Sequence, residues 1–195
     1  MTRYYVPIAA VLVAAALSGC ASSPKSRFYT LSSGAALERS DAQTQYSVAI
    51  GPVTVPEIID RPQIVTHIAT NQVQIAEQER WAGPLKSEIP RVIADNLTLL
   101  LDGAYVYVYP QNVSPNADYQ VPVEVQRFDS RLGDAVTVEA LWAVRPAQGG
   151  VVKNGRSKVR EATNGNNYDA LVAAYSRALT AVSRDIADAI RSTRQ

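Results

Sequence analysis

The chain has 195 residues, of which 19 are Lys or Arg and 18 are Asp or Glu, so its formal net charge is +1. A nearly neutral chain creates no long-range field, and this argues against nucleic acid as a partner. A single cysteine excludes an internal disulfide, and a single histidine argues against a metal cluster. We therefore expect neither a metal nor a cofactor.

The N-terminus has the order of residues that is typical of a secretory signal peptide. Arg3 precedes an apolar run over residues 6–17, which is twelve residues long. That run is shorter than the roughly 18 to 20 residues that span a bilayer. Small residues follow it, and Cys20 comes directly after them. We expect residues 1–19 to be this signal.

The sequence LSGC at residues 17–20 resembles the bacterial lipobox. In that class of signal the cysteine thiol is lipidated, the chain is cut before the cysteine, and the new amino terminus is acylated. Ala21 follows Cys20, and by the same resemblance a residue other than aspartate there directs the lipoprotein to the outer membrane. Several acyl chains on one cysteine would anchor it stably, whereas one alone binds marginally. The alternatives are an ordinary signal peptide and a short buried helix with an incidental cysteine.

Residues 20–45 are rich in Ser, Ala and charge, and we expect them to form a lipidated tether. The island RFYTL at residues 27–31 interrupts this composition. Because Phe28, Tyr29 and Leu31 should not stay in water, we expect the island to pair with a sheet edge or to lie against the folded body. The remaining residues, 46–195, are expected to form a single periplasmic domain.

The domain is expected to begin with strands. Apolar residues alternate over residues 46–56, with a bulge or bend at Gly51-Pro52. A turn between two prolines follows, and then a hairpin whose strands cover residues 63–68 and 73–79, joined by the turn TNQ.

An amphipathic helix is expected over residues 84–101, where apolar residues recur at steps of three and four. Pro90 is awkward there, because proline in a helix interior costs about 3 kcal/mol. Either the helix kinks at Pro90, or it starts near Ser87 and the earlier turn is separate. Asp102-Gly103 should end it.

Tyrosine and valine alternate over residues 104–110, which predicts a strand with Tyr105, Tyr107 and Tyr109 on one face. We favour packing within the sheet as the role of this tyrosine face. The alternative is a lipid groove, which would need a cavity lined by apolar side chains.

Two further strands are expected over residues 118–129 and 134–146. The dipeptide Asn154-Gly155 is typical of a two-residue hairpin turn. A last amphipathic helix follows Asn166 or Asn167, either of which can cap it. Together these elements predict an α+β fold, with a mostly antiparallel sheet and two helices packed on one face.

The sequence is poor in catalytic groups, and we expect no enzyme. His67 lies in an expected strand and is interpreted as a surface residue, because no second histidine and no GxSxG motif accompanies it. Glu77 and Glu79 share a strand face, which a solvated surface explains at least as well as acid–base chemistry. A periplasmic hydrolase with a serine or carboxylate cluster beside His67 is the least favoured alternative.

Four segments of the chain are distinctive when taken in their order: FYTL at 28–31, IGPVTVPEIIDRPQIV at 50–65, ERWAGPL at 79–85, and VEVQRFD followed by VTVEALWAVR between 123 and 145. Together they resemble the PqiC (YmbA) family of auxiliary lipoproteins of ABC-type and MCE-type transport systems. Pro90 and His67 depart from the family pattern, in which an ordinary helix former and a basic residue are usual.

The resemblance implies a non-enzymatic subunit of an envelope lipid transport system that supports membrane integrity. Such a lipoprotein would be held in the outer membrane by the lipid on Cys20 and would dock a periplasmic MCE-domain protein. A homo-oligomer is an open expectation, because a docking piece for a ring-shaped partner could itself be a ring. The alternative is a stand-alone carrier that holds a lipid or another hydrophobic ligand in its own cavity.

Four residues of the motifs are candidates for partner binding. Asp60, Arg61 and Pro62 belong to IIDRP, and a rigid loop of this kind loses little entropy when it binds. A turn held by a hydrogen bond between Asp60 and Arg61 explains the same motif. Trp81 is either a core residue or an interface anchor, since tryptophan and arginine are enriched at binding hot spots.

Overall fold

The computed structural model describes residues 24–34, 45–110 and 116–194. Cys20, and with it the predicted signal and lipidation site, lies outside the described residues. No helix in the described part of the chain is both long and apolar enough to cross a membrane. The elements in chain order are β1 (Arg27–Tyr29), β2 (Tyr46–Thr54), the 3-10 helix η2 (Glu57–Ile59), β3 (Gln63–Ala69), β4 (Gln72–Trp81), α2 (Leu85–Leu100), β5 (Ala104–Val108), β6 (Tyr119–Ser130), β7 (Ala135–Pro146), β8 (Lys153–Ala162) and α3 (Tyr168–Thr193).

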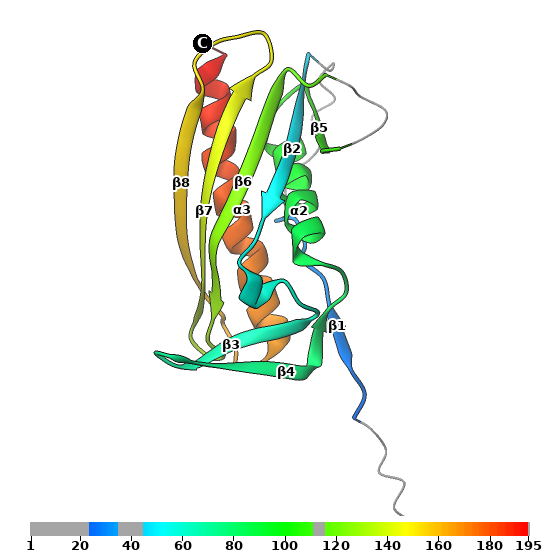
Figure 1. Ribbon diagram of the computed structural model, residues 1–195, viewed down its shortest axis with the longest axis vertical. Coiled ribbons are helices and arrows are strands. Elements are labelled where there is room, and N and C mark those ends of the chain that lie inside the picture. Colours follow the sequence, from blue (N-terminus) through cyan, green and yellow to red (C-terminus); the bar gives the residue numbers. More distant parts are fainter. Residues whose placement is uncertain (1–23, 35–44, 111–115, 195) are drawn as a thin grey trace, which may run out of the picture.

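The strands form two mixed sheets. The main sheet has the order β5-β2-β6-β7-β8, and the small sheet has the order β1-β4-β3. Strand β2 runs parallel to β5 and β6, and β1 runs parallel to β4. The pairs β3-β4, β6-β7 and β7-β8 are antiparallel and include the longest pairings. Figure 1 shows the small sheet across one end of the main sheet, opposite the C-terminus.

Both helices pack against one face of the main sheet (Figure 1). Helix α3 lies against β7 and β8, α2 lies against β2 and β5, and the two helices contact each other. Aliphatic side chains such as Ile93, Val138 and Leu179 are almost fully buried between these layers, and each such burial contributes about 1.5–3 kcal/mol. The predicted α+β fold with two helices on one sheet face is confirmed.

Helix α2 accommodates Pro90 inside its length and starts at Leu85. The backbone N–H groups of Ser87 and Glu88 donate to the carbonyl of Pro84, at 2.8 and 3.0 Å, so the first turn is already helical. The alternative of a start near Ser87 is therefore wrong. Proline at position 90 leaves one carbonyl a turn earlier without its usual helical donor.

The predicted hairpin turn at Asn154-Gly155 is wrong. Both residues lie inside β8, where Gly155 pairs with Trp142 of β7. A Cβ atom on Gly155 would lie 2.1 Å from Cζ2 of Trp142, so the glycine is needed because the indole ring approaches the backbone closely. The connection between β7 and β8 is instead made by residues 147–152, in which Gly149 has a φ of 78°.

The segment that follows β1 is fastened across the two helices. Leu31 is only 1% exposed. The N–H of Gly34 donates to Oδ1 of Asn96 at 2.9 Å, and Nδ2 of Asn96 donates to Oγ of Ser183 at 3.2 Å. The expectation that the RFYTL island pairs with a sheet edge is confirmed, since β1 pairs with β4. Its second residue, Phe28, is nevertheless 65% exposed, so the expectation that it leaves the water is wrong.

Candidate functional site

The four candidate docking residues line one cavity. Asp60, Arg61 and Pro62 connect η2 to β3, and Trp81 is the last residue of β4. The cavity has a volume of about 490 Å³ and is completed by Phe28, residues 82–84 and Lys86. We call it the β4–α2 cavity. The fold thus brings together two motifs that are some twenty residues apart in the sequence.

The two cationic side chains that line this cavity, Lys86 and Arg61, differ in their partners. The carboxylate of Asp60 accepts a hydrogen bond from Nζ of Lys86 at 3.0 Å, so Asp60 is tied to α2 rather than to Arg61. The backbone N–H of Arg61 donates to the carbonyl of Ile59 at 2.8 Å. Nε of Arg61 is buried and has no hydrogen-bond partner among the described residues. A buried donor without a partner is costly.

Trp81 is a core residue that also forms part of the cavity wall. It is 5% exposed, and its ring makes T-shaped contacts with Phe128 and Tyr175 at centroid distances of 6.3 and 6.0 Å. Phe128 and Tyr175 stack on each other at 3.9 Å, and the Tyr175 hydroxyl donates to the Phe128 carbonyl at 3.0 Å. These three rings, called the aromatic cluster, join the end of β4 to β6 and α3.

Glu79 fastens β1 to β4 beside the cavity. Its carboxylate accepts hydrogen bonds from Nε of Arg27 at 3.0 Å and from the Tyr29 hydroxyl at 2.6 Å. The hydrogen bond from Arg27 lowers the pKa of the Glu79 carboxyl. Burial, followed by the hydrogen bond to Glu79, raises the pKa of Tyr29 to about 12. Glu79 is 6% exposed, so the expected solvated face holds for Glu77 and is wrong for Glu79.

Acid should therefore weaken the attachment of β1. A carboxyl whose pKa is lower in the folded state contributes stability above its unfolded pKa, and loses that contribution as the pH falls through the folded pKa. The ordinary value is 4.5, so the free energy of unfolding should decrease once the pH falls below about 4.5. Urea titrations at several pH values should show a shallower acid decrease for Glu79→Gln. Identical pH dependence in the two proteins would contradict this role of Glu79.

His67 lies in β3 and is partly exposed. Its Nε2 is 3.5 Å from Oδ1 of Asp129, and both residues line a cavity of about 300 Å³ together with Ser130. The Ser130 hydroxyl donates to the carbonyl of Val65 at 3.2 Å and not to the imidazole, so this arrangement lacks the bond between nucleophile and base that hydrolysis requires. Among residues 24–34, 45–110 and 116–194, no group of three metal-ligating side chains gathers.

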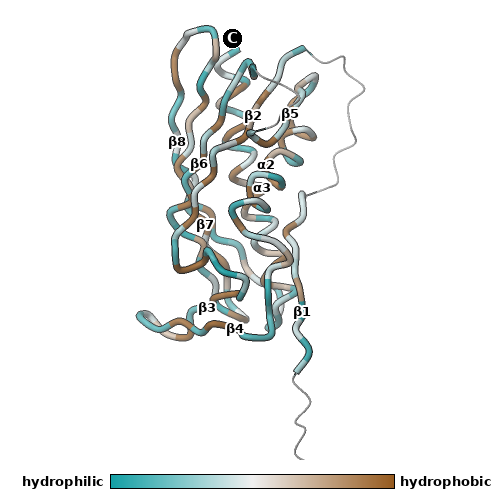
Figure 2. The backbone as a smooth tube through the Cα atoms, turned by 45° about the vertical axis from the view of Figure 1, so that its right-hand side comes forward, coloured by the Kyte–Doolittle hydropathy of each residue, from teal (hydrophilic) through white to brown (hydrophobic). Residues whose placement is uncertain are grey.

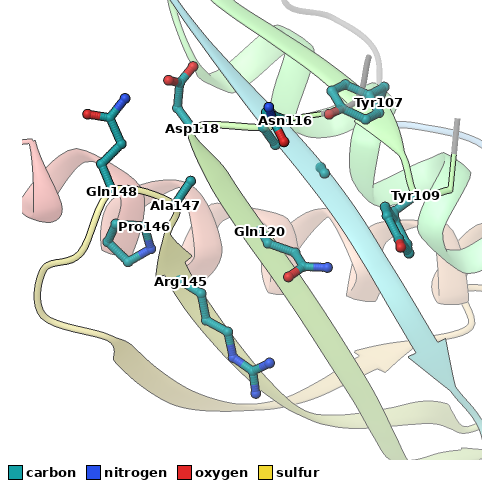
Figure 3. A pocket seen from close by; sticks show the side chains of 11 residues that line it. Tyr107, Tyr109, Asn116, Asp118, Gln120, Arg145, Pro146, Ala147 and Gln148 are labelled. Carbon is teal, nitrogen blue, oxygen red and sulfur yellow. The ribbon is translucent and has the colours of Figure 1, made fainter. Parts of the chain in front are cut away.

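A third cavity lies on the face of the main sheet that the helices leave uncovered (Figure 3). It has a volume of about 560 Å³, and Asn116, Asp118, Gln120 and Arg145 give it a polar lining. Such a lining suits an acyl chain poorly, because lipid-binding cavities are mostly apolar.

The three tyrosines of the predicted tyrosine face differ in their exposure to solvent. Tyr107 is 5% exposed, whereas Tyr105 and Tyr109 are 46% and 51% exposed. The ring centroids of Tyr105 and Tyr107 are 5.5 Å apart, which is a packing contact. Tyr107 and Tyr109 both line the polar cavity of Figure 3, so this face does not provide an apolar groove.

Sequence reasoning did not assign Phe28 and Lys86 to the site. Phe28 is the first residue of the motif FYTL, and Lys86 directly follows the motif ERWAGPL. Their proximity to Arg61 depends on the pairing of β1 with β4 and on the start of α2. The pairing of β1 with β4 is not encoded by a local pattern.

Comparison with known proteins places these features in a family. The family model for ABC-type transport auxiliary lipoprotein components matches residues 29–187. A crystal structure described as that of an uncharacterized protein has a TM-score of 0.71 and 20% identity, covering 86% of this chain and 99% of that chain. A crystal structure of a protein from Xanthomonas campestris has a TM-score of 0.63 and 18% identity, covering 82% and 92%. At these identities the two structures show a common fold. No curated protein matches the chain.

Proposed function

Because the chain belongs to the family of ABC-type transport auxiliary lipoprotein components, we propose that it is the outer-membrane subunit of an MCE-type envelope lipid transport system. In this role a lipid on Cys20 anchors it at the periplasmic face, where it docks the periplasmic MCE-domain protein and supports membrane integrity. The family is non-catalytic, so the chain is not an enzyme. Membership in this family also confirms the resemblance to PqiC.

The β4–α2 cavity is the observation that supports docking most strongly. The two motifs that form it, IIDRP and ERWAGPL, lie within the matched residues 29–187. The cavity combines an aromatic floor, formed by Trp81, with the rigid loop that carries Arg61. Aromatic and arginine side chains in a partly desolvated pocket are the usual anchors of a protein interface.

The lining also defines the chemistry of the partner segment. Apolar walls come from Phe28, Pro62 and Trp81, and Nε of Arg61 has no partner in the described part of the chain. Lys86 is engaged by Asp60, so Arg61 supplies the remaining positive charge. We expect the partner to insert an apolar side chain that lies next to a carboxylate, because a guanidinium binds carboxylates with two parallel hydrogen bonds.

Replacing Arg61 with alanine should weaken binding of the MCE-domain protein at least about tenfold, which corresponds to about 1.4 kcal/mol, because arginine side chains are enriched among the residues that carry most of the binding energy. The matched control is Arg145→Ala, which removes the same side chain from the uncovered sheet face. It should leave the dissociation constant within about twofold. Titration calorimetry with both variants decides the point. If Arg145→Ala weakened binding and Arg61→Ala did not, the docking surface would lie on the uncovered sheet face, and the assignment to this cavity would be contradicted.

A stand-alone carrier is the second candidate function, and the volume of the same cavity favours it. About 490 Å³ falls within the range of small-molecule sites. Mass spectrometry of lipid extracted with the purified chain would test this alternative. A stoichiometric hydrophobic ligand whose loss accompanies Trp81→Phe would support the carrier, and a chain free of lipid would contradict it.

A further inference from the structure

The described chain begins at the end of the molecule that carries the small sheet. Figure 1 shows β1 entering there, opposite the C-terminus. The Ser26 hydroxyl donates to Oε1 of Gln78 in β4 at 3.0 Å, so the chain is fastened to the small sheet from residue 26 onward. Arg27 and Tyr29 continue this attachment through Glu79. The end of the domain at which residues 26–29 are attached is therefore fixed.

Cys20 precedes Pro24 by only four residues. Four residues span at most about 14 Å even when fully extended. A lipid on Cys20 would thus hold Pro24, and with it the small sheet, close to the membrane surface. Because β1 is paired with β4 and the following segment is bound to both helices, the domain cannot move away from the membrane without breaking these bonds.

Three large apolar side chains are exposed on this small sheet. Phe28 of β1 is 65% exposed, Ile68 of β3 is 49% exposed and Val73 of β4 is 36% exposed. Figure 2 shows the β3–β4 hairpin projecting beyond the main sheet, with apolar stretches on both strands behind a polar tip. Ile68 and Val73 lie together near the hairpin tip, where His67 pairs with Val73. Phe28, in contrast, pairs with Arg80 near the other end of β4. Apolar side chains exposed on the sheet that carries an anchored terminus are typical of a surface that meets lipid.

We propose that the small sheet is a membrane-contact surface, in which Ile68 and Val73 of the β3–β4 hairpin lie in the headgroup region of the membrane that holds the lipid anchor. This inference rests on the proposed lipidation of Cys20. Apolar faces of interfacial elements enter this region by about 5–10 Å, and polar neighbours such as Gln72 and Gln74 can hydrogen-bond to headgroups. The contact would orient the domain and keep the β4–α2 cavity beside the membrane.

Fluorescence quenching by lipid tests the proposal on the full-length lipoprotein. Cys20 is the only cysteine of the chain, and its thiol carries the lipid, so an introduced cysteine is the only free thiol. A fluorophore is attached at Ile68→Cys, and in a matched control at Val151→Cys. Val151 is 75% exposed and lies in the β7–β8 connection, at the opposite end of the molecule (Figure 1). The proteins are reconstituted into phosphatidylethanolamine–phosphatidylglycerol vesicles that contain a headgroup-nitroxide lipid.

The proposal predicts that the nitroxide lipid quenches most of the fluorescence at position 68 and almost none at position 151. Equal quenching at the two positions would overturn it. A label that is shielded at position 68 yet unquenched, in a manner that depends on protein concentration, would assign the surface to a second copy and also overturn it. Flotation of the vesicles distinguishes failure of the lipid anchor from failure of the membrane contact. A protein that does not float with the vesicles refutes the anchor and this contact together, whereas one that floats but stays unquenched refutes the contact alone.

Discussion

Replacing Trp81 with alanine should lower the free energy of unfolding by about 3–5 kcal/mol, the range for truncating a large buried aromatic residue. Trp81 is 5% exposed and contacts both other rings of the aromatic cluster. These contacts join the small sheet to β6 and α3, so their loss should loosen the attachment of the small sheet as well as the local packing. Urea denaturation followed by circular dichroism measures the change.

Trp81→Phe provides the control for this prediction. A smaller ring keeps an apolar group between Phe128 and Tyr175, and we expect the loss of stability to fall to about 1–2 kcal/mol. If Trp81→Ala cost less than about 1 kcal/mol, the ring would not carry core packing energy. Trp81 would then have to be treated as an interface residue alone.

Replacing Gly155 with alanine should lower the free energy of unfolding by about 1–3 kcal/mol, because the new methyl group would overfill a packed site. Its Cβ would lie 2.1 Å from Cζ2 of Trp142. The ring cannot withdraw easily, since its Nε1 donates to Oγ of Ser157 at 2.9 Å and that hydroxyl donates to Asp185 of α3 at 2.5 Å. Relief of the clash must therefore disturb the contact of β8 with α3.

Gly83→Ala is the matched control, because the nearest atom to its added Cβ would be Oε1 of Glu88 at 3.5 Å, an ordinary contact. We expect this variant to melt within about 2 °C of the native chain, and Gly155→Ala to melt several degrees lower, at about 2–4 °C for each kcal/mol. Equal melting temperatures for the two variants would contradict the packing role of Gly155.

Gly155 also shows why one hairpin was misplaced from the sequence. Asn-Gly favours a tight turn when the backbone requires a positive φ, but Gly155 does not adopt one. It is selected by a side chain on the neighbouring strand, and its partner Trp142 lies thirteen residues earlier in the chain. A dipeptide pattern contains no information about such a cross-strand contact.

Local patterns did predict most individual elements. The apolar spacing of three and four residues located α3, and Asn167 caps it by accepting a hydrogen bond from the N–H of Ala170 at 2.8 Å. The bulge at Gly51-Pro52 appears as a register shift between Ile50 and Val53. Helix periodicity and strand alternation depend on residues that are close in sequence. They can therefore be recognised without knowing which elements pack together.

The division of the strands into two sheets was not predictable in the same way. Period-two alternation shows that a strand has a buried face, but it does not identify the strand with which it pairs. The attachment of β1 depends on Glu79, which lies 52 residues after Arg27. The spacing of Glu79 predicts a solvated carboxylate. In the structure this carboxylate is buried and accepts hydrogen bonds from Arg27 and Tyr29.

The four candidate docking residues were selected from the sequence without their arrangement, and their role in docking stays a prediction. Asp60, Arg61, Pro62 and Trp81 were selected from two separate motifs, and the fold places them around one cavity. The sequence also suggested a turn held by a hydrogen bond between Asp60 and Arg61. The Asp60 carboxylate instead accepts a hydrogen bond from Lys86, in the first turn of α2. Long side chains from another element can replace a local partner whenever packing brings them within reach.

We propose that this chain docks the periplasmic component of an envelope lipid transport system. The most direct test is the mass in solution of the chain with Cys20→Ser, measured alone and after mixing with the periplasmic MCE-domain protein of the same cell. We expect a stable complex that contains both proteins, whether or not the chain first forms a closed oligomer of its own. If each protein keeps its separate mass at micromolar concentrations, the proposed docking role is contradicted.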